Sequence, residues 1–253
     1  MLKVQIKPYY EQDGIVLYHA DCRDVLPQLG PVDHVITDPP YSKDLYLKFR
    51  TNRFPRGFDD GKAAREMQNG AIGSIDDILD SVAAEFVRLT RRWMIVFHDA
   101  EIAHRWREAI GPCYVRFGVW VKPNAVPQMS GDRPGQGFES MTIGHAKGRK
   151  RWNGGGLPAV WTVLAVNSQA EARAAADHPC PKPEALMTQL VSQFTDPNDL
   201  ILDPFAGSGT TAVAAKRLGR RCILIEREEK YCEVAAKRLS QGALNLFSTE
   251  KPA

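Results

Sequence analysis

Residues Leu200-Ile-Leu-Asp-Pro-Phe-Ala-Gly-Ser-Gly-Thr-Thr211 decide the fold of this chain. The apolar run at 200–202 has the composition of a buried strand, and residues 212–218 have that of a helix ended by Gly219. Between them, Gly207-Ser-Gly-Thr-Thr-Ala212 matches the pattern G-x-G-x-x-G/A. Because the pattern joins a predicted strand to a predicted helix, it predicts a βα unit whose glycine loop approaches a ligand closely.

Glu226 strengthens this prediction, because it ends the next predicted strand, about twenty residues after the glycines. A carboxylate at this place can accept hydrogen bonds from both hydroxyls of a ribose, which predicts an adenosine-bearing cofactor. NAD is one candidate, but Asp203 and Phe205 suit an ammonium and an adenosyl group better than a pyrophosphate. The lysine of a nucleotide-hydrolysing P-loop is absent. The cofactor-binding residues predicted in the loop are Asp203, Phe205, Ala206, Gly207, Ser208, Gly209, Thr210 and Thr211.

The other predicted elements alternate between strands and helices. Predicted strands cover residues 14–18, 33–37, 93–97 and 114–121, and predicted helices cover residues 22–29, 75–89, 101–110, 183–194 and 230–239. This alternation predicts an α/β fold, Rossmann-like and doubly wound, with a mostly parallel sheet covered on both faces.

One segment does not follow this alternation. Between residues 122 and 177, prolines, glycines and basic residues interrupt the pattern, as expected for an inserted recognition region. We therefore expect a single domain in which residues 1–121 form a first half, 122–177 an insertion, and 178–253 the half that binds the cofactor.

The composition limits the classes of protein to which the chain can belong. Its 253 residues, 43% hydrophobic and 25% charged, are typical of one soluble globular unit. The sequence has no apolar run long enough to span a bilayer and no secretory signal, so we expect a cytoplasmic protein. Its five scattered cysteines form no C-x-x-C pair, which favours reduced thiols and no metal site. A net charge of +3 does not by itself indicate a polyanionic partner.

A second motif, Asp38-Pro-Pro-Tyr41, follows the predicted strand at 33–37. Two adjacent prolines end a strand, so the motif lies at the carboxyl end, where α/β sheets bind ligands. An exocyclic amine of a base is a poor nucleophile until hydrogen bonds to Asp38 and to the Pro39 carbonyl favour a tetrahedral nitrogen. The carboxylate also stabilises the positive charge that develops there, and Tyr41 can stack on the base. The alternative is an ordinary strand-ending turn with a surface aspartate.

Both motifs resemble those of the amino-methylating DNA methyltransferases, whose catalytic motif is D-P-P-Y and whose cofactor motif is D-P-F-x-G-S-G-T. The order here, with the catalytic motif first and a variable segment before the cofactor motif, resembles the permuted β class. The resemblance implies a class I methyltransferase fold, S-adenosylmethionine as cofactor and double-stranded DNA as substrate. It also implies that Asp38, Pro39, Pro40 and Tyr41 are catalytic, that Asp38 borders the cofactor, and that a homodimer forms. The D-P-P-Y form is typical of adenine N6 methylation, whereas S-P-P-Y is commoner for cytosine N4.

Two further segments are similar to parts of the same family. His178-Pro-Cys-Pro-Lys182-Pro183 resembles the segment H-P-x-x-K-P, which implies that Lys182 lies against the methionine part of the cofactor. Ala20-Asp21-Cys22 resembles a G-D segment whose acid reaches the adenine of the cofactor, with alanine in place of glycine here. The resemblance therefore adds Asp21, Cys22 and Lys182 to the expected cofactor site.

Two basic clusters, at 42–70 and 144–156, are candidates for phosphate contacts around a base flipped out of the duplex. The candidate DNA-binding residues are Lys43, Arg50, Arg53, Lys147, Arg149, Lys150, Arg151 and Trp152. For any single one of them, a solvated surface position is the alternative. The sequence also leaves open cytosine-N4 methylation, a catalytically silent DNA-binding regulator, and a nicotinamide oxidoreductase.

Overall fold

The computed structural model describes residues 4–43, 74–125, 131, 134–165 and 181–241. Its described strands form one nine-stranded sheet with the order β1-β2-β9-β8-β3-β4-β6-β5-β7. The strands are Tyr10–Gln12 (β1), Ile15–His19 (β2), His34–Thr37 (β3), Trp93–His98 (β4), Tyr114–Val121 (β5), Phe138–His145 (β6), Val160–Thr162 (β7), Leu200–Asp203 (β8) and Arg221–Glu226 (β9). The α-helices are Cys22–Val25 (α1), Leu79–Leu89 (α4), Ala103–Ile110 (α5), Glu184–Phe194 (α7), Thr210–Arg217 (α8) and Glu229–Ser240 (α9).

The central strands β2, β9, β8, β3 and β4 run parallel to one another. From β3 the chain crosses to β4 on one side, whereas from β8 it crosses to β9 on the other. The strand order therefore reverses between β3 and β8. In open α/β sheets, ligands bind at such a switch point, outside the carboxyl ends of the strands. Asp38 follows β3 and Asp203 ends β8, so both sequence motifs meet there.

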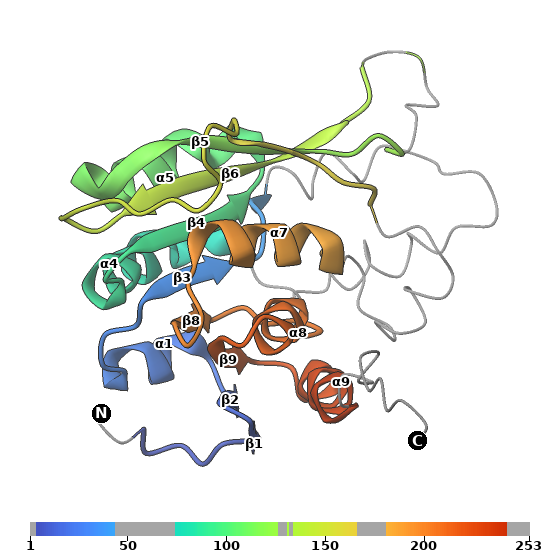
Figure 1. The fold of residues 1–253 in the computed structure, drawn as a ribbon. Helices are drawn as coiled ribbons and strands as arrows, with labels where there is room; N and C mark the ends of the chain where they lie inside the picture. The colour runs from blue at the N-terminus through green and yellow to red at the C-terminus, as the bar shows by residue number, and fades with distance from the viewer. Residues whose placement is uncertain (1–3, 44–73, 126–130, 132–133, 166–180, 242–253) are drawn as a thin grey trace, which may run out of the picture.

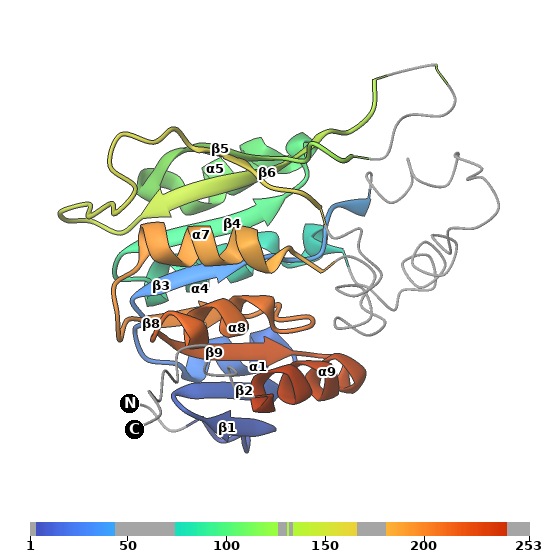
Figure 2. The same cartoon turned by 45° about the vertical axis from the view of Figure 1, so that its right-hand side comes forward.

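Helices cover both faces of the sheet (Figures 1 and 2). One apolar core joins α7, α8 and α9 to the sheet and includes Leu190 and Leu224, both fully buried. The other core joins α1, α4 and α5 to the opposite face, where the rings of Phe86 and Trp106 stack with centroids 6.2 Å apart. The prediction of a doubly wound α/β fold with a mostly parallel sheet is confirmed. Within the described residues, no helix is long and apolar enough to cross a membrane.

Most predicted elements are present, with changes at their ends. The helix predicted at 75–89 begins with a 3-10 turn, Ile75–Asp77, before α4. The helix predicted at 22–29 is α1 followed by the 3-10 turn Leu26–Gln28, because Pro27 has no N–H to continue an α-helix. These differences do not alter the order or direction of the strands.

The segment 122–177, in which the regular sequence pattern breaks, contains two strands. β6 inserts between β4 and β5, and β7 pairs with β5 at the edge of the sheet. β6 escaped sequence analysis because Ser140 and Thr142 interrupt its apolar residues, although both are buried. Their hydroxyls bond to His98 of β4, at 2.8 Å to its carbonyl and 2.9 Å to its ring. A target-recognition role for the rest of the segment stays a prediction.

The start of the chain also lies elsewhere than the division into halves predicts. β2 pairs with β9 in parallel, with Ile15 opposite Cys222 and His19 opposite Glu226. In space, β1, β2 and α1 therefore belong with the predicted cofactor half, although residues 1–121 were assigned to the half that carries Asp38.

Candidate active site

The catalytic loop leaves β3 at Asp38 and is anchored immediately after Tyr41. The backbone N–H of Ser42 donates to Oδ2 of Asp99 at 3.0 Å, and the N–H of Lys43 donates to Oδ2 of Asp76 at 2.8 Å. Asp99 follows β4 and is buried, so it links the loop to the neighbouring parallel strand. Sequence analysis missed this role, although an acid directly after a predicted strand was a visible signal.

A cluster of charged side chains gathers around Asp38. The Lys182 ammonium, just before α7, contacts Oδ2 of Asp38 and lies 3.2 Å from Oε2 of Glu139 and 3.5 Å from the Tyr41 hydroxyl. The Tyr41 hydroxyl donates to Oε2 of Glu139 at 2.7 Å, and Lys122 contacts Oε1 of the same carboxylate. Residues far apart in the sequence therefore meet at the carboxyl end of β3.

The pKa values of the two carboxylates in this cluster are shifted in opposite directions. Burial raises the pKa of Asp38, with Lys182 lowering it and the negative charge of Glu139 raising it. Burial also acts to raise the pKa of Glu139, but Lys182 and Lys122 outweigh it and lower this pKa to about 2. One oxygen of Asp38, Oδ1, is buried and accepts no hydrogen bond from the residues that the structure describes. A buried carboxylate oxygen in this state is an acceptor suited to a ligand N–H.

Asp203 has a different environment from the one that the sequence predicts. Its Oδ1 accepts hydrogen bonds from the Thr37 hydroxyl at 2.7 Å and from the Phe205 N–H at 3.2 Å, and its Oδ2 accepts from the Thr211 hydroxyl at 2.6 Å. The side chain is almost fully buried, which raises its pKa to about 6. Asp203 therefore ties β3 and α8 to β8 and shapes the glycine loop, and its oxygens already have donors within the protein.

Glu226 holds the glycine loop from the end of β9. Its Oε2 accepts from the Gly207 N–H and its Oε1 from the Glu228 N–H, both at 2.8 Å. Burial raises the pKa of Glu226, against the hydrogen bonds from these N–H groups. The neighbouring strand β2 leads to Asp21, because the Ala20 N–H donates to the Glu226 carbonyl at 3.0 Å. Two carboxylates thus lie at the same edge of the sheet.

Asp21 and Cys22 begin α1. Asp21 accepts from the backbone N–H of Arg23 at 2.9 Å and from its guanidinium, and hydrogen bonding to the Arg23 side chain lowers the pKa of Asp21. Cys22 is buried, and this burial raises its pKa to about 12. Its thiol therefore stays protonated and apolar at neutral pH.

Gly209 begins α8 in the left-handed region, with φ at +76°. A Cβ there would lie 3.0 Å from that of Ala235 on α9, so only glycine allows this close packing. Arg238 of α9 donates to the Ser208 carbonyl at 2.6 Å and to the Thr210 hydroxyl at 3.2 Å. Ala206, Ser208, Thr210 and Thr211 are buried at the loop or the start of α8, and Phe205 is half-buried.

The predicted DNA-binding residues at 147–152 do not join this site. β6 runs antiparallel to β4, so the last residue of β6, His145, pairs with the first residue of β4, Trp93. We call this side of the sheet, where the parallel strands begin, the amino edge. Asp38 lies beyond the opposite edge, roughly 20 Å away by the length of a six-residue strand. The sequence did not reveal the direction of β6. Lys147, Arg149, Lys150, Arg151 and Trp152 follow β6 directly.

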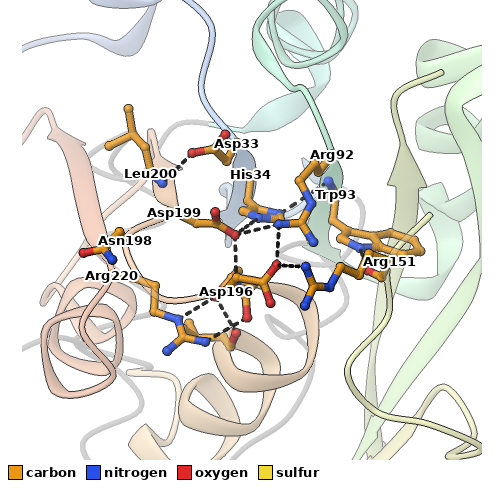
Figure 3. A network of polar contacts seen from close by, with 12 residues as sticks. Asp33, His34, Arg92, Trp93, Arg151, Asp196, Asn198, Asp199, Leu200 and Arg220 are labelled. Carbon is orange, nitrogen blue, oxygen red and sulfur yellow. Dashed lines mark hydrogen bonds and ion pairs between the residues drawn. The ribbon is translucent and has the colours of Figure 1, made fainter. Parts of the chain in front are cut away.

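Two of these residues have partners in the structure. The Trp152 ring packs on Phe194 with centroids 4.7 Å apart, so its role here is in the core. Arg151 belongs to a polar network at the amino edge, in which its guanidinium is 3.5 Å from Asp196 and its carbonyl accepts from the Trp93 indole at 2.6 Å (Figure 3).

Of the basic residues predicted near the catalytic motif, only Lys43 lies in the described chain. It is exposed and its ammonium pairs with Asp77 at 2.9 Å. Arg50 and Arg53 lie outside the described residues, so their predicted phosphate contacts stay predictions.

The comparisons with known proteins agree with this geometry. A family model described as DNA methylase, for N6 and N4 methyltransferases, matches residues 145–237. The type II methyltransferase M2.LlaDCHI of Lactococcus lactis subsp. cremoris is 30% identical over 94% of this chain and 93% of its own length. The chain belongs to the DNA amino-methyltransferases. M2.DpnII of Streptococcus pneumoniae is 28% identical to this methyltransferase over 92% of each chain.

Solved structures show the same fold. The complex of M1.HpyAVI with S-adenosylmethionine has a TM-score of 0.64 and 28% identity, covering 89% of this methyltransferase and 98% of that chain. The PvuII DNA methyltransferase, described as cytosine-N4-specific, has a TM-score of 0.72 at 18% identity, covering 96% and 91%. The latter likeness concerns the fold alone. The expected family, fold and cofactor are thereby confirmed, and the cofactor is S-adenosylmethionine.

The donor set of the site fits this cofactor. Glu226 and Asp21 offer carboxylates at one edge for hydroxyl and amino donors, and the Glu226 oxygens accept from the Gly207 and Glu228 N–H groups. Gly207 and Gly209 have positive φ angles, which let the backbone of the loop before α8 approach Glu226 closely. Lys122 and Glu139, which also belong to the Asp38 cluster, were assigned no role from the sequence.

Proposed function

We propose that this methyltransferase methylates N6 of adenine in double-stranded DNA, and that it flips the target base out of the helix. The observation that carries the proposal is the buried Oδ1 of Asp38, which has no donor within the described part of the chain and lies at the switch point of the sheet. A base stacked within a duplex cannot bring its exocyclic amine to this enclosed carboxylate oxygen, which supports flipping.

In the proposed reaction, Asp38 and the Pro39 carbonyl accept the two N–H groups of the amine. These hydrogen bonds localise the nitrogen lone pair and aim it at the methyl group that S-adenosylmethionine supplies. The nitrogen–methyl bond would form as the sulfonium–methyl bond breaks, which leaves a neutral thioether. The charge of Asp38 stabilises the positive nitrogen until it releases a proton to solvent. The Tyr41 ring is held by its hydroxyl on Glu139 and offers a face on which the base can stack.

The cofactor-binding roles that we propose follow from the same geometry. Glu226 accepts from the ribose hydroxyls, Asp21 lies beside the adenine, and the loop from Asp203 to Thr211 surrounds the amino-acid part together with Lys182. Asp203 acts there by fixing the loop, since its own oxygens bond to Thr37 and Thr211.

The choice of adenine rests on the D-P-P-Y form of the motif, because both exocyclic amines present the same donors to Asp38. The test is to incubate the protein with labelled S-adenosylmethionine and mixed-sequence duplex DNA, and to identify the labelled nucleoside by mass. N6-methyladenine is expected. N4-methylcytosine would replace adenine as the target, and no labelled nucleoside from a cofactor-binding protein would favour a silent DNA-binding regulator.

The resemblance to the β class also leads us to propose a homodimer. Sedimentation equilibrium over a range of protein concentrations checks this, with twice the monomer mass of 28.2 kDa as the expected limit. A constant monomer mass at every concentration would contradict the proposal.

A further inference from the structure

We propose that Glu139 is a positioning residue of the transfer reaction, which takes the Lys182 ammonium from Asp38 when the substrate amine enters and holds Tyr41 against that amine's base. This inference rests on the proposed function of the Asp38 site. It concerns how that site is opened to substrate and gives β6, which sequence analysis overlooked, a part in catalysis.

Glu139 contacts Tyr41 and two lysines. Its Oε2 is shared by the Tyr41 hydroxyl at 2.7 Å and by Lys182 at 3.2 Å. Its Oε1 contacts Lys122, whose ammonium also lies 4.6 Å from the centre of the Trp120 ring. Glu139 lies opposite Trp120 in the pairing of β5 with β6. The sheet therefore fixes the backbone position from which the Glu139 carboxylate extends.

Lys182 lies between the carboxylates of Asp38 and Glu139. Its ammonium donates to Asp38, the carboxylate that the substrate amine must also reach. Lys182 is only 9% exposed, so it would lose free energy if it left Asp38 without another acceptor. Glu139 is that acceptor, because it already lies within ion-pair distance of the same nitrogen. A shift of the ammonium toward Glu139 frees Asp38 without leaving a buried charge unpaired.

The positive and negative charges of the cluster are equal in number. Asp38 and Glu139 supply two negative charges, and Lys122 and Lys182 supply two positive charges. Glu139 keeps its charge most firmly, since the two lysines lower its pKa to about 2 after opposing its burial. Among the described residues, the charged and titratable groups that face Asp38 from the surrounding elements are Tyr41, Lys122, Glu139, Lys182 and Asp203.

The first test measures the methyl-transfer step in a single turnover with saturating cofactor and duplex DNA. Glu139→Gln keeps an acceptor for Tyr41 but removes the charge, so Lys182 stays on Asp38 and competes with the amine. We expect the rate to fall roughly 10- to 100-fold, the effect of losing a hydrogen bond to a charged group. The dissociation constant of S-adenosylmethionine should stay within about twofold. Glu85→Gln, on the outer helix α4, is the matched control and should transfer at the wild-type rate.

The second test does not need activity. Carbon-13 NMR of the Asp38 carboxyl gives its pKa in the wild type, in Glu139→Gln and in Lys182→Met. Glu139→Gln should lower this pKa by removing a nearby negative charge, whereas Lys182→Met should raise it. A folding role alone would not move the pKa in opposite directions. Unchanged pKa values, or a Glu139→Gln enzyme with an undiminished rate, would overturn the inference.

The two tests separate this inference from the proposed function. If the wild type transfers no methyl group to DNA but the Asp38 pKa shifts as described, the proposed function fails and the coupling of Glu139 to Asp38 stands. If the wild type methylates DNA and neither measurement responds to Glu139→Gln, the further inference fails and the proposed function stands.

Discussion

The two oxygens of Asp38 meet different surroundings. Oδ2 contacts the Lys182 ammonium, while Oδ1 is buried with no donor among the described residues. An uncompensated buried acceptor is costly for folding, and active sites retain such groups because a ligand satisfies them. A substrate N–H can therefore reach Oδ1 while Lys182 still contacts Oδ2, and the proposed shift of the ammonium to Glu139 then leaves the charge of Asp38 to the amine.

Asp38→Ala should lower the methyl-transfer rate by roughly 100- to 1000-fold, as expected when a charge-stabilising group is removed from an active site. Cofactor binding should survive at least in part, because Glu226 ends β9, which lies two strands away from β3 in the sheet. Single-turnover transfer and calorimetric titration with S-adenosylmethionine measure the two effects. Asp80→Ala, on α4, is the control. Near-full activity of Asp38→Ala would show that another group carries the reaction.

Glu226→Ala should weaken S-adenosylmethionine binding by roughly 10-fold or more, the effect of losing hydrogen bonds to a charged acceptor. The variant also removes the acceptor of the Gly207 and Glu228 N–H groups, which loosens the loop. Calorimetry gives the dissociation constant, with Glu233→Ala on the exposed side of α9 as the control. An unchanged constant would remove Glu226 from the ribose.

At the scale of elements, Asp203 joins three of them. It lies on β8 and accepts hydroxyl donors from Thr37 at the end of β3 and from Thr211 on α8. The switch point of the sheet is thereby crossed by a hydrogen bond between the end of β3, next to Asp38, and the first residue of the cofactor motif. Any loosening here changes the spacing between the catalytic loop and the cofactor loop.

Thr211→Val should lower the free energy of unfolding by about 1–3 kcal/mol, because a buried carboxylate loses a donor. Urea denaturation followed by circular dichroism measures the loss. Thr162→Val, at an exposed position on β7, should change stability by less than about 0.5 kcal/mol. Equal stability of Thr211→Val and the wild type would mean that water replaces the hydroxyl.

The elements that sequence patterns predicted are those with a single period and clear ends. β8, its glycine loop and α8 were predicted because an apolar run, glycines and a helix follow one another. β6 was not, because its polar residues Ser140 and Thr142 are satisfied inside the sheet by His98, and a sequence does not show such pairing. The same limit hid Glu139, an isolated acid whose partners come from other elements.

At the scale of the molecule, the amino edge of the sheet carries a second polar network (Figure 3). Arg92 donates to Asp196 at 3.0 Å and to Asp199 at 2.8 Å, and the same oxygen of Asp199 is 2.9 Å from the buried ring of His34. The network ties the starts of β3 and β4 to the turn before β8. It lies at the opposite edge from Asp38, so it serves the fold and not the chemistry.

Arg92→Met should therefore lower the free energy of unfolding by about 1–3 kcal/mol, since it leaves two partly buried carboxylates without their shared donor. The transfer rate per folded molecule should be unchanged. Arg91→Met is the matched control, because Arg91 is the exposed neighbour. A slower transfer step in folded Arg92→Met would show that the two edges of the sheet are coupled.

Stability should also depend on pH through His98. Burial lowers its pKa from 6.5 to about 4, so the folded chain binds fewer protons than the unfolded chain between these values. The contribution of His98 is complete above pH 6.5 and is lost as the pH falls toward 4, by up to about 3 kcal/mol. Asp203, with its pKa raised to about 6, acts in the opposite sense over part of this window.

The pH effect of His98 is measured as the difference in unfolding free energy between the wild type and His98→Asn at pH 7 and pH 5. The difference should be smaller at pH 5, because the wild type alone loses the His98 contribution. A difference that does not change with pH would mean that the ring titrates as in the unfolded chain. The background slope from Asp203 is common to both proteins and cancels.

At the scale of the whole molecule, the sequence predicted the class of fold but not the direction of every strand. The order of strands and helices gave the α/β class, and the positions of Asp38 and Glu226 at strand ends placed both at the carboxyl edge. The sequence did not show that β6 reverses, so the basic residues 147–152 were expected beside the catalytic motif and lie at the other edge.

The pairing of β2 with β9 has a consequence for biosynthesis. A ribosome adds about 5–20 residues per second, so roughly 10 to 40 s separate the emergence of Asp38 from that of Glu226. Until β9 is made, β2 can pair only with β1, and an isolated hairpin is marginally stable in water. The nascent polypeptide therefore carries its reactive carboxylate long before it can capture a methyl donor. Interrupted translation would release fragments that contain the D-P-P-Y motif and leave DNA unmodified.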